Sequence, residues 1–159
     1  MLKYVRFASI EDFEFIYDSI RADLQEQGVI HRFKYTKEEF KNCIFSEKPL
    51  AIFLILLIDK TPAGFANYSI DHRNFTANKL SNLYVNDLFV LKAFRRMSGA
   101  TLLMDRLKEI ARQEKCGRIE GFVLAENAVA LQFYEKSLKS TIISHGLHYM
   151  RLELASDDC

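Results

Sequence analysis

The stretch "FVLKAFRRMSGATLLMDRL", Phe89 to Leu107, begins as an apolar strand and ends as an amphipathic helix. Two arginines, Arg95 and Arg96, and three small residues, Ser98 to Ala100, lie at the junction. A helix N-terminus carries unpaired backbone N–H groups and about half a positive charge, so it attracts anions. Small side chains let a ligand approach the backbone, and Gly99 can take a positive φ. The junction therefore predicts a binding site for phosphate groups.

Simpler interpretations of this junction stay open on the residues alone. Arg95 and Arg96 could be a solvated loop pair, and Ser98 to Ala100 could serve a tight contact between helix and strand. The standard motifs GxxxxGK[ST], GxGxxG and GxSxG do not occur in the sequence. The sequence therefore does not support ATP hydrolysis, a dinucleotide-binding fold or a serine hydrolase.

The overall composition is ordinary for a soluble globular protein. The chain has 159 residues, of which 49% are hydrophobic and 27% are charged. A length of this order is usual for one compact domain, so we expect a single domain over residues 1–159. The formal net charge is +1, which excludes a global basic field of the kind that draws a protein to nucleic acid or acidic membranes. Neither partner is expected.

Cysteines and histidines give no sign of a disulfide framework or a metal site. The cysteines are widely spaced, which favours reduced thiols; they are Cys43, Cys116 and Cys159. The histidines show no ligand spacing; they are His31, His72, His145 and His148. The N-terminus lacks a hydrophobic signal-peptide core, and the longest apolar run, 49–58, is far shorter than the roughly 20 residues of a membrane span. We expect no metal and a cytoplasmic location.

Hydrophobic periodicity predicts two helices ahead of a main sheet, followed by a crossover unit. Strands are expected at 4–7, 51–58, 63–70, 80–90 and 118–124, with one or two more within 141–154. Helices are expected from Ser9 toward Gly28, from a capping box at Thr36–Glu39 to near Phe45, at 99–114, and at 128–137 with Asn127 as the N-cap. The order strand, helix, strand over 80–124 predicts a right-handed crossover between two parallel strands.

A second stretch, "AENAVALQFYEKS" at 125–137, changes the interpretation of the first. It matches the motif N-x-x-A-x-x-F-Y-E-K through Asn127, Ala130, Phe133, Tyr134, Glu135 and Lys136. The first stretch matches V-x-x-x-x-R-x-x-G-x-G/A in register through Val90, Arg95, Ser98 and Ala100. Together the two stretches resemble the GNAT superfamily of N-acetyltransferases, in detail over about 80–137.

The resemblance implies a fold and an activity. The fold is a three-layer α/β domain with a twisted, mostly antiparallel sheet of about six to seven strands, helices on both faces, and a parallel pair beside the cofactor. The activity is that of an acetyl-CoA-dependent N-acetyltransferase. Its cofactor is acetyl-CoA, its partner is a small-molecule primary amine, and a homodimer is a possible assembly.

The resemblance also assigns the cofactor-binding residues. The pantetheine arm pairs with the backbone of the strand that ends in Leu88, Phe89 and Val90, as an added strand would. The diphosphate lies on the junction, whose residues are Arg95, Arg96, Met97, Ser98, Gly99, Ala100 and Thr101. The second motif completes the set with Asn127, Ala130, Phe133 and Lys136.

Proton transfer requires a base and an acid. A lysine-like amine with a pKa near 10.4 is neutral only about once in 10³ molecules at pH 7. Asp87 is the nearest carboxylate on the strand, although alternation points it away from Asn86; a water chain ending at Asp87, Glu120 or bulk solvent stays an alternative. Tyr134 matches the family's tyrosine acid, a phenol with a pKa of about 10 that can protonate the departing sulfur. A packed core aromatic is the alternative for Tyr134.

Within the superfamily, the spacing is most similar to the diamine (spermidine/spermine) acetyltransferase branch. Its strand and hairpin motifs look like "YVNDLFV" at 84–90 and "AGFANYSID" at 63–71. Asn86 stands where that branch has a glutamate, and an amide cannot take up a proton. Arg96 and Ser98 replace two glycines of the family's R-G-x-G. If Ser98 needs a positive φ, serine costs about 1 kcal/mol or more relative to glycine.

Polyamines and aminoalkyl compounds are the candidate acceptors under this interpretation. Two other functions stay open on the sequence. One is a CoA-binding sensor or regulatory protein without turnover, which the residues at 86, 96 and 98 favour. The other is a protein acetyltransferase that acts on a lysine or an N-terminus.

Overall fold

The computed structural model describes residues 1–73, 75–77, 79–143, 146 and 151–153. It divides the chain into two compact units, Met1–Phe122 and Val123–Cys159. The first unit contains the sheet and the expected crossover. The second contains the residues of the expected N-x-x-A-x-x-F-Y-E-K motif.

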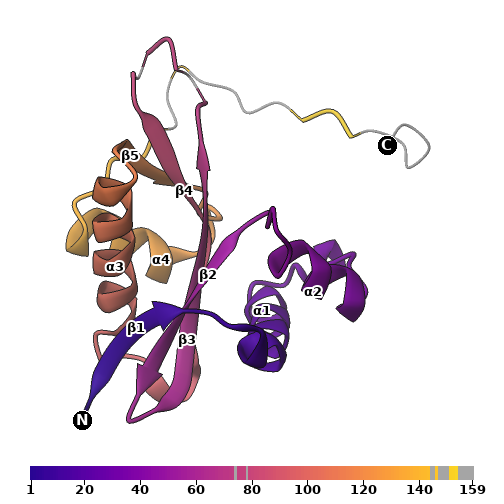
Figure 1. The fold of residues 1–159 in the computed structure, drawn as a ribbon. Coiled ribbons are helices and arrows are strands. Elements are labelled where there is room, and N and C mark those ends of the chain that lie inside the picture. Colours follow the sequence, from indigo (N-terminus) through magenta and orange to yellow (C-terminus); the bar gives the residue numbers. More distant parts are fainter. Residues whose placement is uncertain (74, 78, 144–145, 147–150, 154–159) are drawn as a thin grey trace. The chain divides into compact units, whose positions relative to one another are not determined.

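The first unit is built on a five-stranded sheet whose strands follow one another in chain order (Figure 1). The strands are β1 (Lys3–Phe7), β2 (Ile52–Ile58), β3 (Thr61–Asp71), β4 (Ser81–Val90) and β5 (Cys116–Gly121). Neighbouring strands are antiparallel except β4 and β5, which are parallel. The expected mixed sheet, hairpin and parallel pair are therefore confirmed. The described residues form five strands rather than six or seven, and most of 141–154, where the others were expected, lies outside the described residues.

Helices lie on both faces of this sheet (Figure 1). α1 (Phe13–Glu26) and α2 (Lys37–Ile44) lie on one side, and α3 (Gly99–Gln113) lies on the other. Three short 3-10 turns join these elements: η1 (Ile10–Asp12), η2 (Ile30–Arg32) and η3 (Lys92–Phe94). The expected capping box of α2 is confirmed, because the Glu39 N–H donates to the Thr36 hydroxyl and the Thr36 N–H donates to the Glu39 carboxylate.

Strand β2 shows how the sheet packs against a layer of helices on each of its two faces. All of its residues except Ile52 are buried, so both of its faces are apolar. Phe53, Ile55 and Leu57 belong to the cluster that also contains the apolar side chains of α1 and α2. The alternate residues Leu54 and Leu56 are fully buried as well. An uninterrupted apolar run is therefore what a central strand between two helical layers requires.

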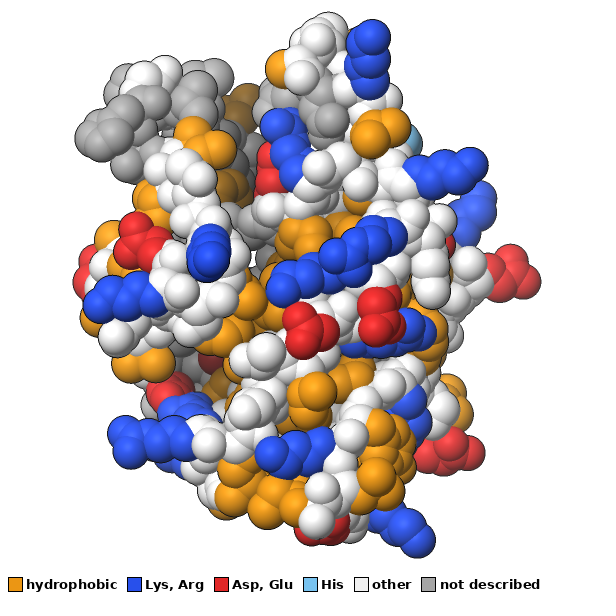
Figure 2. Space-filling view, turned by 90° about the vertical axis from the view of Figure 1, so that its left-hand side faces the viewer, with side chains coloured by type: hydrophobic (Ala, Val, Ile, Leu, Met, Phe, Trp, Pro, Cys, Tyr) orange, Lys and Arg blue, Asp and Glu red, His pale blue; other side chains and the backbone are white. Residues whose placement is uncertain are grey.

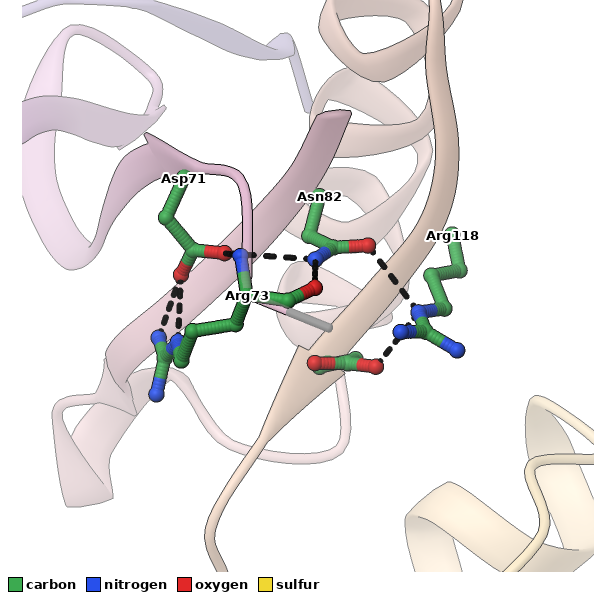
Figure 3. Close-up of polar contacts among 5 residues, drawn as sticks. Asp71, Arg73, Asn82 and Arg118 are labelled. Atoms are coloured by element: carbon green, nitrogen blue, oxygen red, sulfur yellow. Dashed lines mark hydrogen bonds and ion pairs between the residues drawn. The ribbon is translucent and has the colours of Figure 1, made fainter. Parts of the chain in front are cut away.

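A polar network joins the first half of β4 to β3 and β5 (Figure 3). Asn82, which is fully buried, donates from Nδ2 to the Arg73 backbone oxygen at 2.9 Å and to Asp71 Oδ1 at 3.2 Å. Its Oδ1 accepts from Arg118 Nε at 2.9 Å, and Arg118 also pairs with Glu120 at 2.6 Å. The parallel pair is thus held together by side chains as well as by its backbone ladder.

The outer surface of α3 carries charges of both signs. Arg106 pairs with Glu109 at 2.8 Å, and Lys108 pairs with Asp105 at 3.2 Å. In Figure 2, which looks onto the side of α3, basic and acidic side chains lie next to one another. In the part of the chain that the structure describes, no helix has both the length and the apolar character that crossing a membrane would require.

The second unit contains the predicted helix over 128–137 in two segments. These are α4 (Ala128–Gln132) and η4 (Phe133–Ser137), the latter a π-helical turn. Asn127 is the N-cap as expected, because its Oδ1 accepts a hydrogen bond from the Ala130 N–H at 3.1 Å. His145, His148 and Cys159 lie outside the described residues.

Candidate functional site

Strand β4 extends beyond the end of β5, its parallel neighbour. Its pairing with β5 runs from Ser81–Cys116 to Val85–Gly121 and ends there. On its other side, β4 stays paired with β3 as far as Gly64–Val90. Residues 86–90 of β4 therefore have one edge that β5 does not use. We call this segment the open end of β4, and we call residues 81–85 its closed end.

A β-bulge lies where the open end begins. Asn67 pairs with Asp87 and Tyr68 pairs with Val85, so Asn86 is the extra residue of β4. Strict alternation, which the sequence suggested, does not hold across this point. Asp87 lies with Asn67, whose Nδ2 donates to Asp87 Oδ2 at 2.7 Å, while Asn86 is exposed. The bulge thus sets which side chains of the open end face the α1 layer.

The junction between β4 and α3 contains two strained residues. Arg96 and Ser98 both have a φ of 62°, in the left-handed region that favours glycine. They occupy the positions at which the R-G-x-G motif has glycines, so the strain considered from the sequence is present. Gly99, which could take a positive φ, is helical and buried. A Cβ there would lie 2.5 Å from the Leu56 side chain, so Gly99 serves the tight contact between α3 and β2.

The N-terminus of α3 has the features of an anion-binding turn. Ser98 is the N-cap, but its side chain makes no capping hydrogen bond. The N–H groups of the first turn, at Gly99, Ala100 and Thr101, are thus left without a side-chain cap. The preceding loop is held by β1, because Lys3 Nζ donates to the Met97 backbone oxygen at 2.7 Å. These residues fit a diphosphate group, which needs several converging N–H donors and little side-chain bulk.

The side chain of Arg95 is directed to α1. Its two terminal nitrogens each lie 2.7 Å from a carboxylate oxygen of Glu26, and its Nε donates to the Val90 backbone oxygen at 2.9 Å. This pairing lowers the pKa of Glu26. Arg95 is thus an exposed loop residue, as the solvated-pair interpretation has it, but its side chain is also engaged by Glu26 and by the Val90 backbone. Its guanidinium group ties the last turn of α1 to the end of β4.

Two carboxylates lie between α1 and the open end of β4. Burial raises the pKa of Asp87, and the hydrogen bond from Asn67 opposes that rise. Burial likewise raises the pKa of Asp23 to about 6, against a hydrogen bond from Gln27 Nε2 at 2.7 Å, and the charges of Asp87 and Glu26 raise it further. Asp23 and Asn67 were missed from the sequence. The available signal for Asp23 was its position three residues after Ile20 on the apolar stripe of α1.

The predicted site residues fall into two groups that the structure describes separately. The first unit holds Asp87, Leu88, Phe89 and Val90 on β4, then Arg95, Arg96 and Met97 in the loop, and Ser98, Gly99, Ala100 and Thr101 at the start of α3. The second unit holds Asn127, Ala130, Phe133, Tyr134 and Lys136. Within that unit, the rings of Phe133 and Tyr134 meet edge to face with centroids 5.5 Å apart. Glu120, the alternative end of a proton path, is paired with Arg118.

Comparison with known families identifies the chain. The family model described as "Acetyltransferase (GNAT) family" matches residues 13–139, which is most of the chain. The chain therefore belongs to the GNAT acetyltransferase family, and its enzyme class is N-acetyltransferase. The resemblance seen in the two sequence motifs is confirmed at the level of the family.

Solved structures of low sequence identity share the fold. An integron cassette protein from the mobile metagenome of V. cholerae is 21% identical, with a TM-score of 0.77 over 99% of this chain and 96% of that one. An aminoglycoside acetyltransferase from an uncultured soil metagenomic sample, solved with sisomicin, is 13% identical, with a TM-score of 0.71 over 96% and 97%. A ribosomal-protein-alanine N-acetyltransferase from Brucella melitensis biovar Abortus 2308 is 14% identical, with a TM-score of 0.73 over 96% and 100%.

Proposed function

We propose that the chain transfers the acetyl group of acetyl-CoA to a primary amine of a small molecule by direct attack of the amine. The observation that carries the proposal is the open end of β4, which leads into the uncapped N-terminus of α3 within one unit. An unpaired strand edge can bind an extended amide chain, and a helix start can bind a diphosphate. Acetyl-CoA carries both groups in one molecule, together with a thioester that supplies the activated acetyl group.

Each group of residues has a role in this proposal. The backbone of Leu88, Phe89 and Val90 pairs with the pantetheine amides, and residues 95–101 hold the diphosphate. Asn127, Ala130, Phe133 and Lys136 of the second unit complete the binding of the cofactor. Tyr134 acts as the acid that protonates the departing sulfur, since a phenol can give up a proton as negative charge develops.

The acceptor is proposed to approach from the side of α1. This side of the open end carries Asp23 and Asp87, and Glu26 lies one turn further along α1. Carboxylates favour a cationic amine over a neutral or acidic acceptor. Such an acceptor agrees with the diamine branch that the sequence resembles, and one fold neighbour is an aminoglycoside acetyltransferase solved in complex with sisomicin. We therefore propose polyamines and aminoalkyl compounds as the first acceptors to test.

The experiment has two parts, which separate cofactor binding from turnover. First, acetyl-CoA at 100-fold its dissociation constant should stabilise the protein by about 2.7 kcal/mol, which a thermal melt detects. Second, a panel of primary amines should release free thiol in the presence of acetyl-CoA. Stabilisation without thiol release from any amine, peptide amines included, would instead favour a CoA-binding sensor. The strained Arg96 and Ser98 are the observation that favours this second function.

The proposed role of Tyr134 has its own test. Tyr134→Phe should lower kcat by about 10²-fold, with little change in the affinity for acetyl-CoA, because only the phenolic proton is lost. Phe133→Leu is the matched control in the same turn and should act on stability rather than on the rate of the chemical step. An unchanged kcat in Tyr134→Phe would assign this tyrosine to packing.

A further inference from the structure

The apolar layer between α1 and the sheet ends in a polar pair. On α1, the buried residues Phe13, Ile16 and Ile20 are followed at the same spacing by Asp23, which is 8% exposed. On the sheet, the pair Phe65 and Phe89 is followed two residues along each strand, and so on the same face, by the pair Asn67 and Asp87. The buried stripe of α1 in its last turn, and the facing β3–β4 pairs two residues beyond Phe65 and Phe89, thus both change from apolar to polar side chains that include a carboxylate.

The partners of these two carboxylates are neutral. Gln27 donates to Asp23 Oδ1, and Asn67 donates to Asp87 Oδ2, both at 2.7 Å. Among the described residues, no hydrogen bond is made to the second oxygen of either carboxylate. The nearest cation that acts on Asp23 is Arg95, whose terminal nitrogens are engaged by Glu26. Two largely buried carboxylates therefore share a region in which no described cation pairs with them directly.

We propose that Asp23 is a positioning residue for acetyl transfer, which forms one proton-accepting unit with Asp87, and that Asp87 takes the proton from the ammonium group of the acceptor. This inference rests on the proposed function. It answers the question left by Asn86, whose amide cannot take up a proton although it occupies the position of the glutamate in the diamine branch.

The transfer of protons and bonds balances as follows. The ammonium group gives one proton to Asp87, and its nitrogen then has a lone pair with which to attack the thioester carbonyl carbon. The N–C bond forms and the C–S bond breaks; the departing sulfur takes the proton of the acid proposed above, Tyr134, and the second N–H proton restores that phenol. The third proton stays on the amide product. The proton held by the carboxylate unit leaves to solvent before the next cycle.

A second carboxylate makes Asp87 a better base. An isolated aspartate with a pKa near 3.9 is a weak acceptor for a proton from an amine with a pKa near 10.4, and a raised pKa narrows that gap. The charge of Asp87 raises the pKa of Asp23. Because repulsion between two like charges is mutual, we expect an ionised Asp23 to favour the protonated form of Asp87 in turn. The other charged groups that act on Asp23 are Glu26 of α1 and Arg95 of the loop after β4, and they oppose each other.

Two variants and a matched control test the inference. Asp23→Asn keeps the shape of the side chain and removes its charge. Asp87→Asn does the same for the partner. Asp18→Asn is the control, because Asp18 is an exposed aspartate on the same helix. The pH profile of kcat/KM is measured with acetyl-CoA and spermidine, or with the amine of the panel that wild type acetylates fastest. A ¹³C NMR titration of the aspartate carboxyl groups is made on the same proteins without acetyl-CoA.

The expected results separate a positioning role from a purely structural one. Asp87→Asn should lose at least about 10²-fold in kcat. Asp23→Asn should move the acidic limb of the profile to lower pH and lower kcat by about ten-fold, with the KM for acetyl-CoA unchanged. In the titration, Asp87 should ionise at lower pH in Asp23→Asn than in wild type, and Asp18→Asn should match wild type in both measurements.

Contrary outcomes distinguish the inference from the function on which it rests. An active wild type whose pH profile and Asp87 titration are the same in Asp23→Asn would overturn the pairing and leave the acetyltransferase intact. A wild type that acetylates no amine would overturn the proposed function and the proton-accepting role together, even if the titration showed two coupled carboxyl groups. If Asp23→Asn failed to fold, the Asp23 resonance in Asp87→Asn would decide, because it should titrate at lower pH than in wild type.

Discussion

The two ends of β4 differ in how completely their polar groups are satisfied. At the closed end, Asn82 makes three hydrogen bonds that join β3, β4 and β5 (Figure 3). At the open end, the parallel ladder has stopped, the strand bulges at Asn86, and Asp87 is a half-buried carboxylate whose charge acts on a second acid, Asp23. One strand therefore contains a half whose polar groups are paired across the sheet and a half that keeps an open edge and a carboxylate with a neutral partner, where we propose binding and proton transfer.

The largest expected effect on stability lies at the closed end. Asn82→Leu has a similar volume but cannot accept from Arg118 or donate to Asp71 and the Arg73 backbone. We expect the free energy of unfolding to fall by about 2–4 kcal/mol, measured by urea denaturation, because buried partners lose their hydrogen bonds. Asn86→Leu, at the exposed extra residue of the same strand, is the control and should change stability by less than about 0.5 kcal/mol. Equal losses in both variants would show that the two ends are not different in this way.

The next effect is a pH dependence of stability, which arises from Asp23 on the α1 side of the open end. The folded-state pKa of Asp23 is about 6, above its value in the unfolded chain, so folding favours its protonated form. Its contribution to stability is full below about pH 4 and is lost as the pH rises through about 6, by up to about 2–3 kcal/mol. Asp23→Asn should therefore be more stable than wild type at pH 8 and equal to it near pH 4. Denaturation at both pH values checks this, with Asp18→Asn as the control that should follow wild type.

The sequence predicted most of the fold because its apolar patterns are local. The run at 51–58, the amphipathic stripe of α1 and the crossover over 80–124 each specify an element without reference to the rest of the chain. The strand and the helix start on either side of the proposed phosphate-binding junction were predictable for the same reason, since they are contiguous in the sequence.

The parts that the sequence did not show depend on contacts between distant segments. The bulge at Asn86 is a matter of register between β3 and β4, and alternation along one strand cannot reveal it. Asp23 and Asp87 are 64 positions apart by their numbers, and only packing of α1 on the sheet places them near each other. The sequence showed only that Gly99 can take a positive φ, whereas the close approach of Leu56 is what requires a glycine there.

A smaller effect tests the strain at the end of β4. Ser98→Gly should stabilise the protein by about 1 kcal/mol, or about 2–4 °C in melting temperature, because glycine adopts a left-handed φ without a clash. Lys60→Gly, at a left-handed residue of the turn between β2 and β3, is the matched control and should gain similar stability. Only Ser98→Gly should also change the affinity for acetyl-CoA. A loss of affinity would show that the serine hydroxyl donates to the cofactor, and a gain would show that strain weakens the binding turn.

The smallest effect concerns the ion pair that ties α1 to the open end. The side chains of Glu26 and Arg95 are each 38% exposed, so solvent screens their attraction. Glu26→Gln should therefore cost less than about 1 kcal/mol of stability, measured by denaturation. Glu26→Gln should affect catalysis more than its small effect on stability suggests. Arg95 also donates to the Val90 backbone oxygen, and without Glu26 it would lose the partner that orients it. If the guanidinium group of Arg95 acts by holding α1 in place, Glu26→Gln and Arg95→Gln should raise the KM for the amine by similar factors. Both variants should then leave the affinity for acetyl-CoA nearly unchanged. If it instead serves the diphosphate, Arg95→Gln alone should weaken acetyl-CoA binding, and the open end would be joined to the cofactor rather than to the acceptor side.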